Sequence, residues 1–217
     1  MKYVLQRIVQ LISLALFVLV TISGKMPLWM AIFVLGVIAT LLIGRIYCGW
    51  ICPINTLMQG VSWIKKKLKI KSLPIPKFMK RSWVRYTMLG VFLLLFVFTM
   101  VSGKRLPVLP ALLGIGVLIT LVFPEALWHR YLCPYGTILS LPGRASKRTM
   151  GIDHSRCTNC GLCAKACPAD AITKEQGQYN ISRKDCLVCM DCQRACPTQA
   201  IAYGGKSPKP QQQAQSL

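Results

Sequence analysis

The sequence predicts a two-part architecture, in which four membrane-spanning helices, built from a repeated two-helix unit, precede a small α+β domain. Three observations lead to this fold class. The first 127 residues contain four long apolar stretches, and the basic residues gather in one segment between the second and third of them. Most of the cysteines stand in two runs of identical spacing near the C-terminal end.

The four apolar stretches each have about the 17–25 residues that a helix needs to cross a bilayer. They are residues 4–22, 28–44, 86–102 and 106–123. Charged residues are nearly absent from them, and Arg7 and Arg45 lie close enough to span ends to reach a membrane interface. Buried helices of a soluble core are the alternative interpretation, but four such stretches exceed what a chain of 217 residues needs for a core.

The distribution of charge predicts the orientation. The segment from Arg45 to Arg85, both included, holds ten Lys or Arg and no acid, whereas the other two connections carry one and two basic residues. By the positive-inside rule the long connection is cytoplasmic, so both termini are cytoplasmic too. We therefore expect a multi-pass protein of the cell (inner) membrane. The net charge of +21 is explained by this topology, and no nucleic-acid-binding motif is present.

The apolar part contains a duplication. The segment YCGWICPINTL at 47–57 corresponds to WHRYLCPYGTIL at 128–139, and each follows a pair of spans. Both Cys-Pro motifs are therefore expected on the same side of the membrane. Mixed apolar and basic segments follow them, at 55–71 and 136–148. We expect these segments on the membrane surface, with a solvated linker as the alternative for the second.

Two cysteine runs define the second part of the chain. CTNCGLCAKACP at 157–168 and CLVCMDCQRACP at 186–197 have the same Cys-x2-Cys-x2-Cys-x3-Cys-Pro spacing and are offset by 29 residues. Three cysteines at this spacing can bind one iron–sulfur cubane while the fourth reaches a second cubane. The predicted ligands are Cys157, Cys160, Cys163 and Cys196 for one [4Fe-4S] cluster, and Cys186, Cys189, Cys192 and Cys167 for the other.

Zinc and disulfides are the competing interpretations of these runs. Zinc would take four ligands in pairs and would leave the Cys-Pro positions unexplained. Disulfides are disfavoured in a reducing cytoplasm. The resulting domain boundaries are 1–150 for the four-helix module, 151–204 for the domain with two [4Fe-4S] clusters, and 205–217 for a disordered tail.

The duplicated runs look like a bacterial two-cluster ferredoxin domain, and residues 1 to about 203 resemble the NapH-like membrane iron–sulfur proteins. NosR and CcoG share parts of this arrangement. The resemblance implies an electron-transfer subunit of a quinol dehydrogenase-type complex, rather than a stand-alone enzyme. Its clusters would relay electrons between membrane quinol and a redox protein partner. The CcoG resemblance permits an alternative, an electron-donating assembly or maturation factor for a metalloenzyme, and a redox-sensing regulator is a third reading.

One departure from that family concerns the second Cys-Pro motif, which is usually Cys-x3-Cys-Pro and here begins with His129. Cys48, Cys52, His129 and Cys133 form two pairs spaced by four, which could converge at the cytoplasmic end of the helices. A third metal or iron–sulfur site, a structural or quinone-contacting role without metal, and thiol redox chemistry all stay open.

Glu125 is the only acid in the first 150 residues and lies four residues before His129. Quinol oxidation releases protons, so Glu125 is a candidate proton acceptor. The alternative is a solvated residue at a helix end.

Overall fold

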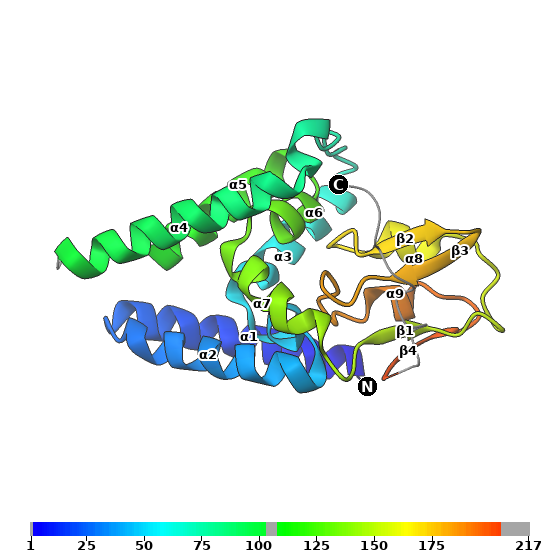
Figure 1. Cartoon of the computed structure of the whole chain (residues 1–217), viewed down its shortest axis with the longest axis horizontal. Coiled ribbons are helices and arrows are strands. Elements are labelled where there is room, and N and C mark those ends of the chain that lie inside the picture. Colours follow the sequence, from blue (N-terminus) through cyan, green and yellow to red (C-terminus); the bar gives the residue numbers. More distant parts are fainter. Residues whose placement is uncertain (1, 103–107, 205–217) are drawn as a thin grey trace.

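The structure is a computed structural model that describes residues 2–102 and 108–204. Its first part, the helical module, contains α1 (Lys2–Ile22), α2 (Met26–Ile43), α3 (Pro53–Lys67), α4 (Ser82–Ser102), α5 (Val108–Val122), α6 (Glu125–Leu127) and α7 (Pro134–Arg144). Two π-helical turns, η1 (Tyr47–Ile51) and η3 (Trp128–Leu132), and a 3-10 turn, η2 (Lys77–Lys80), lie between these helices. Figure 1 shows α1 and α2 along one side and α4 and α5 along the other, with the strands of the second part at one end.

Three of these helices are long and apolar enough to cross a membrane: α1, α2 and α4, over Tyr3–Ile22, Met26–Ile43 and Ser82–Thr99. Large apolar side chains such as Leu19, Leu35 and Leu94 are exposed on them, which suits contact with lipid. The fourth predicted span corresponds to α5, of which 15 residues are described. The first residues of that predicted span, and the predicted tail at 205–217, lie outside the described residues.

The duplication predicted from the sequence is visible in the backbone. In each half, a π-helical turn ends at a cysteine, Cys52 or Cys133, and the following proline begins the next helix. The two cysteines have nearly the same backbone angles, with φ −64° and ψ 117° at the first and φ −72° and ψ 112° at the second. Proline fits there because the N–H groups of the first residues of a helix have no acceptor within the helix, so the N–H that proline lacks is not missed.

Helices α3 and α7 each pack against helices of both halves. Helix α3 packs against α1 of its own half and α5 of the other, while α7 packs against α4 of its own half and α2 of the other. Most of α7 is buried, including Tyr135, Leu139 and Gly143. The first part of the segment 136–148 is therefore not a solvated linker, because α7 packs between the two helix pairs. Arg144, Lys147 and Arg148 at its end are exposed, and their position at the membrane surface stays a prediction.

The second part, the cysteine domain, contains two antiparallel strand pairs and two short helices, α8 (Leu162–Ala166) and α9 (Asp191–Arg194). Strand β1 (Met150–Ile152) pairs with β4 (Ile201–Tyr203), with Gly151 opposite Ala202. Strand β2 (Ile172–Glu175) pairs with β3 (Gln178–Ile181), with Thr173 opposite Asn180. Each pair thus joins the first half of the domain to the second half.

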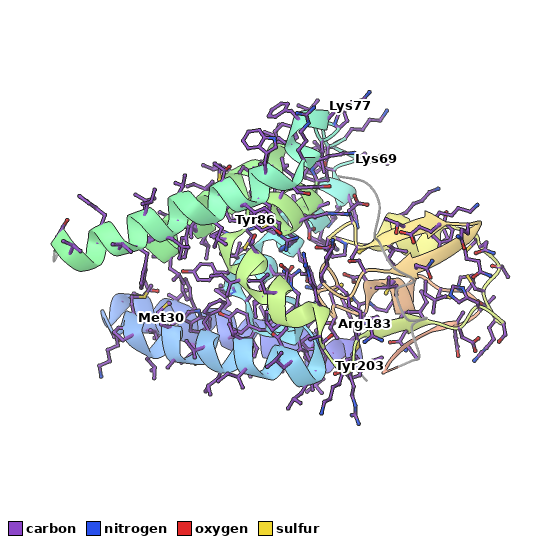
Figure 2. The ribbon with its side chains drawn as sticks, in the orientation of Figure 1. Met30, Lys69, Lys77, Tyr86, Arg183 and Tyr203 are labelled. Carbon is purple, nitrogen blue, oxygen red and sulfur yellow. The ribbon has the colours of Figure 1, made fainter. Side chains whose placement is uncertain are left out.

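The two parts share a hydrophobic core. Buried residues of the helical module, among them Cys48, Trp128 and Cys133, pack in one cluster with Leu187 and Cys189 of the cysteine domain. At the edge of this junction, Arg183 donates to the carbonyl of Ser146 and Tyr203 donates to the carbonyl of Ile43. Figure 2 shows Arg183 and Tyr203 at the boundary between helices and strands. The cysteine domain is therefore packed onto the helical module.

Candidate metal centres

The cysteine domain contains two small cavities, and four thiols line each of them. We call them the inner and the outer cavity. Cys167, Cys186, Cys189 and Cys192 line the inner cavity. Cys157, Cys160, Cys163 and Cys196 line the outer cavity. The structure thus brings together the same two sets of four that the spacing predicts, each with three thiols from one run and one from the other.

The surroundings of both cavities suit an iron–sulfur cluster. The inner cavity is walled by apolar side chains, including Met150, Ile172 and Leu187, and the outer one by Ile152, Tyr179 and Ile201. Thiolate sulfur is the soft ligand that such clusters require, and an apolar wall excludes water from them. The donor set therefore fits one [4Fe-4S] cluster in each cavity, and the ligand assignment stays a prediction.

The backbone around the two cavities repeats with the same 29-residue offset as the cysteines. Asn159 and Val188 have φ of 55° and 54°, and Gly161 and Met190 have φ of 77° and 62°. A left-handed backbone costs a non-glycine residue about 1–2 kcal/mol, so the surrounding structure must hold Val188 and Met190 in place. Gly161 has a second constraint, because a Cβ atom there would lie 2.7 Å from the Tyr179 hydroxyl oxygen.

The two cavities differ in their access to solvent. Cys186, Cys189 and Cys192 are buried, whereas Cys160 is exposed and Cys157 and Cys196 are half-buried. Burial raises the pKa of Cys167 to about 11 and that of Cys189 well above its ordinary value. Metal binding must displace these protons, so cluster insertion at the inner cavity releases protons. Only the outer cavity has a thiol exposed on the protein surface.

The loops that line the inner cavity are those that contact the helical module. Gly49 lies so close to them that a Cβ atom there would be 2.4 Å from the Leu187 carbonyl oxygen. The neighbouring Trp50 indole N–H donates to the Val188 carbonyl at 3.1 Å. The Gln6 amide donates to the carbonyls of both Gly49 and Cys189, at 3.1 and 3.2 Å. The first Cys-Pro motif is therefore in direct contact with the inner ligand loop.

Arginines of the helical module bind the same loops. Arg85 forms an ion pair with Asp185 at 3.1 Å, next to Cys186. Arg130 donates to the backbone carbonyl and the carboxylate of Asp170, three residues after Cys167. Burial alone would raise the pKa of the Asp185 carboxyl, but the Arg85 guanidinium beside it holds that pKa below its usual range. Both contacts tie segments next to the inner thiols to the helices.

These contacts are not predicted by the sequence. Glycine at position 49 and Gln6 carry no metal-ligating chemistry, so neither stood out as a functional residue. One signal was available for Gln6, since a buried amide in an apolar span needs hydrogen-bond partners. Its carbonyl oxygen accepts from Arg194 at 3.1 Å, so both ends of this side chain are satisfied.

The four residues of the predicted third site come from η1 and η3. Burial raises the pKa of the Cys52 thiol, and the charges of the neighbouring Cys48 and Cys133 thiolates raise it further. Burial raises the pKa of Cys133 to about 11, and Gly136 N–H donates to its sulfur at 3.3 Å. In the described ranges, no three His, Cys, Asp or Glu side chains are arranged to hold a single metal ion.

His129 is buried, and its Nε2 has no hydrogen-bond partner within the part of the chain that the structure describes. Burial, with the nearby positive charge of Arg45, lowers the pKa of this imidazole to about 3. His129 is thus neutral at physiological pH. Its role as a fourth ligand beside the three thiols stays a prediction.

Glu125 begins α6, and its Oε2 atom is enclosed without a partner in the described structure. Burial raises the pKa of this carboxyl, against the opposing influence of the Ser62 hydroxyl. The alternative of a freely solvated helix end is therefore less consistent with the structure than an enclosed carboxyl. Its role as a proton acceptor stays a prediction.

Two family models match the chain, and both are described as a 4Fe-4S binding domain. One covers residues 26–71 and 105–153, the region of the two Cys-Pro motifs, and the other covers residues 150–173, the region of the first cysteine run. No solved structure matches the chain.

Curated relatives include the methylamine utilization ferredoxin-type protein MauN of Methylobacillus flagellatus, 31% identical over 58% of this chain and 48% of that protein. The ferredoxin-type protein NapH of Haemophilus influenzae is 28% identical over 60% of this chain and 50% of that protein. An uncharacterized protein of Methanocaldococcus jannaschii is 30% identical over 62% of this chain and 56% of that protein. The chain thus spans about half the length of these relatives.

Proposed function

We propose that this chain, a NapH-like, ferredoxin-type 4Fe-4S protein, relays electrons between membrane quinol and a redox protein partner. The relay would use two [4Fe-4S] clusters, one in each cavity. The observation that carries the proposal is the contact between the first Cys-Pro motif and the inner ligand loop, at Gly49 and Leu187. The helical module is the part that a lipid-soluble quinol can reach.

The difference in burial supports an order for the relay. The inner cavity is enclosed between the helical module and the rest of the cysteine domain, whereas the outer cavity reaches the surface at Cys160. Electron transfer slows steeply with distance, so a partner protein exchanges electrons fastest with the outer cluster. Electrons from the membrane would then pass first to the inner cluster and next to the outer one. The protein sets spacing and environment, while the redox chemistry belongs to the clusters when bound.

We propose a multi-pass membrane location with the cysteine domain in the cytoplasm. Three helices are long and apolar enough to cross a bilayer, and α5 would complete a fourth span. The basic connection between α2 and α4 lies at the end of the helices that carries the cysteine domain. Figure 2 shows Lys69 and Lys77 there. By the positive-inside rule that end faces the cytoplasm.

Iron analysis tests the two-cluster assignment. The chain, purified anaerobically from membranes, is expected to contain about eight irons with matching sulfide, and to show the electron paramagnetic resonance of reduced [4Fe-4S] clusters after addition of a quinol. About twelve irons would establish a third cubane at the Cys-Pro motifs. About four irons, or clusters that no quinol or quinone analogue can reduce or reoxidise in membranes, would contradict the proposed relay.

Glu125 is proposed to accept a proton that quinol releases on oxidation. We expect Glu125→Gln to slow quinol-dependent cluster reduction about 100-fold or more, the range of general-base effects. Because only the ionised carboxyl accepts a proton, the wild-type rate should fall as the pH drops through the raised pKa of Glu125, and the variant should lose that step. Glu175→Gln, on the exposed hairpin, is the matched control. An unchanged rate and pH profile in Glu125→Gln would remove this role.

A further inference from the structure

Arg45 is a buried cation between the two parts of the protein. Its side chain is 1% exposed, and its stem lies against Gly143 of α7. One terminal nitrogen donates to the Lys184 carbonyl at 2.8 Å, two residues before Cys186. The other lies 3.8 Å from the sulfur of Cys48, and Nε has no partner among the described atoms. The guanidinium thus lies between the first Cys-Pro motif and the inner ligand loop.

The charge of Arg45 is not balanced by a carboxylate. Three other arginines at this junction form ion pairs with a carboxylate: Arg85 with Asp185, Arg130 with Asp170 and Arg194 with Asp191. Arg45 forms no ion pair within residues 2–102 and 108–204. Arg183 also has no acidic partner there, but it is only half-buried and water can solvate it.

A buried charge without a counter-charge is strongly unfavourable, so an anion near Arg45 would stabilise the fold. A cubane held by four thiolates is negatively charged, and it gains one more negative charge on reduction. The inner cavity is a candidate for this anion, because the Arg45 guanidinium is hydrogen-bonded to the segment that leads into Cys186, one of the thiols that line it.

We propose that Arg45 is the counter-charge of the inner cluster and raises its midpoint potential. Burial of the inner thiols disfavours the extra charge of the reduced cluster, and a cation enclosed in the same low-dielectric region offsets this penalty. The outer cluster, which is partly solvated at Cys160, does not depend on Arg45. Arg45 is therefore a positioning residue that brings the midpoint potential of the inner cluster, the first in the relay, closer to that of its electron donor. This inference rests on the two-cluster assignment of the proposed function.

A redox titration followed by electron paramagnetic resonance tests the proposal on the full chain, purified anaerobically. Arg45→Gln removes the charge and leaves a polar side chain, and Arg45→Lys keeps the charge. We expect Arg45→Gln to lower the midpoint potential of the inner cluster and leave that of the outer cluster in place. Arg45→Lys should keep the inner midpoint close to that of the wild type. Cys160→Ser, which alters the outer cluster, assigns the two signals.

Arg156→Met is the matched control, because Arg156 is exposed and donates to the Thr198 carbonyl beside the outer cavity. It should not move the inner midpoint. An unchanged inner midpoint in Arg45→Gln overturns the proposal, and so does an equal fall in Arg45→Gln and Arg45→Lys. An unchanged inner midpoint would mean that the Arg45 charge acts on the Cys48 sulfur and not on the inner cluster. An equal fall in both variants would mean that the shape of the Arg45 side chain sets the inner midpoint and that its charge does not. Iron content of the same samples separates these outcomes from a failure of the two-cluster assignment.

Discussion

Cys160→Ser and Cys189→Ser are expected to interrupt electron flow at two different points. In Cys160→Ser, quinol should still reduce the inner cluster, but the transfer of electrons to an external acceptor protein should fall by more than tenfold. In Cys189→Ser, quinol should reduce neither cluster, because the outer cluster is separated from the helical module by the damaged inner one. Each variant replaces one of four thiols, and both thiols line cavities in the same domain.

The measurement is stopped-flow reduction by a quinol analogue in membranes, with electron paramagnetic resonance to count the reduced clusters. The chemical reductant dithionite is the control, since it can reach the outer cluster from solvent without passing through the membrane. We expect dithionite to reduce the outer cluster of Cys189→Ser. If quinol reduced the outer cluster of Cys189→Ser at the wild-type rate, the order inner before outer would be wrong.

The cysteine domain was largely predictable because its chemistry is local. Four thiols in a run of eleven residues, repeated after 29, determine which cysteines can share a cavity, and the structure groups the same two sets. Even the left-handed residues recur with that offset: Asp170 and Gln199 have φ of 50° and 51°. Only Gly161 among the left-handed residues of the two ligand runs could be identified in advance, since glycine is the residue that adopts this conformation without strain.

The packing of the helical module was less predictable. Apolar length identified α1, α2 and α4, but it does not say which helix packs against which. The sequence 136–148 contains Pro142 and several small or basic residues, so its composition favoured a surface or a linker. In the structure it forms α7, with Pro142 in the last turn and Gly143 against the Arg45 side chain. A small residue was needed there because a distant side chain occupies that space, and no local pattern encodes that contact.

The site at the two Cys-Pro motifs was predictable only in part, because some of its contacts join segments that are far apart in the sequence. Pairs spaced by four identified Cys48, Cys52 and Cys133, and the structure places all three in one apolar cluster, while their convergence on a metal stays a prediction. Gly49, which lies between the first two, looked like a spacer. Its function depends on a chain segment about 140 residues later, and such a contact leaves no trace in local periodicity.

Gly49→Ala is also expected to reduce the rate of electron transfer strongly, because it pushes the helical module and the cysteine domain apart at their point of contact. The new Cβ atom would lie 2.4 Å from the Leu187 carbonyl oxygen and 3.2 Å from the Cys189 backbone N and Cα. Real Cβ atoms essentially never lie as close as 2.4 Å to another atom, and 3.2 Å is already a tight contact. All these neighbours are backbone atoms, so the ligand loop must move away. The hydrogen bonds from Trp50 and Gln6 to the same loop would lengthen with it.

We expect quinol-dependent reduction of both clusters to fall by more than tenfold in Gly49→Ala, while dithionite still reduces the outer cluster. The outer ligand set does not touch Gly49, so the domain should keep at least four irons per chain. Gly60→Ala is the matched control: Gly60 lies on α3, and a Cβ atom there meets nothing within 4 Å. Alanine also favours a helix over glycine, by about 1 kcal/mol, so this control should be neutral or stabilising.

Equal rates in Gly49→Ala and Gly60→Ala would show that electrons do not cross at this contact, even if both cavities hold clusters. A loss confined to Gly49→Ala would place the crossing at the point where the first Cys-Pro motif meets the inner ligand loop. The result also bears on the cysteines beside it. Gly49 lies between Cys48 and Cys52, so a crossing there would make these thiols the part of the helical module nearest to the electron path, with or without a metal of their own.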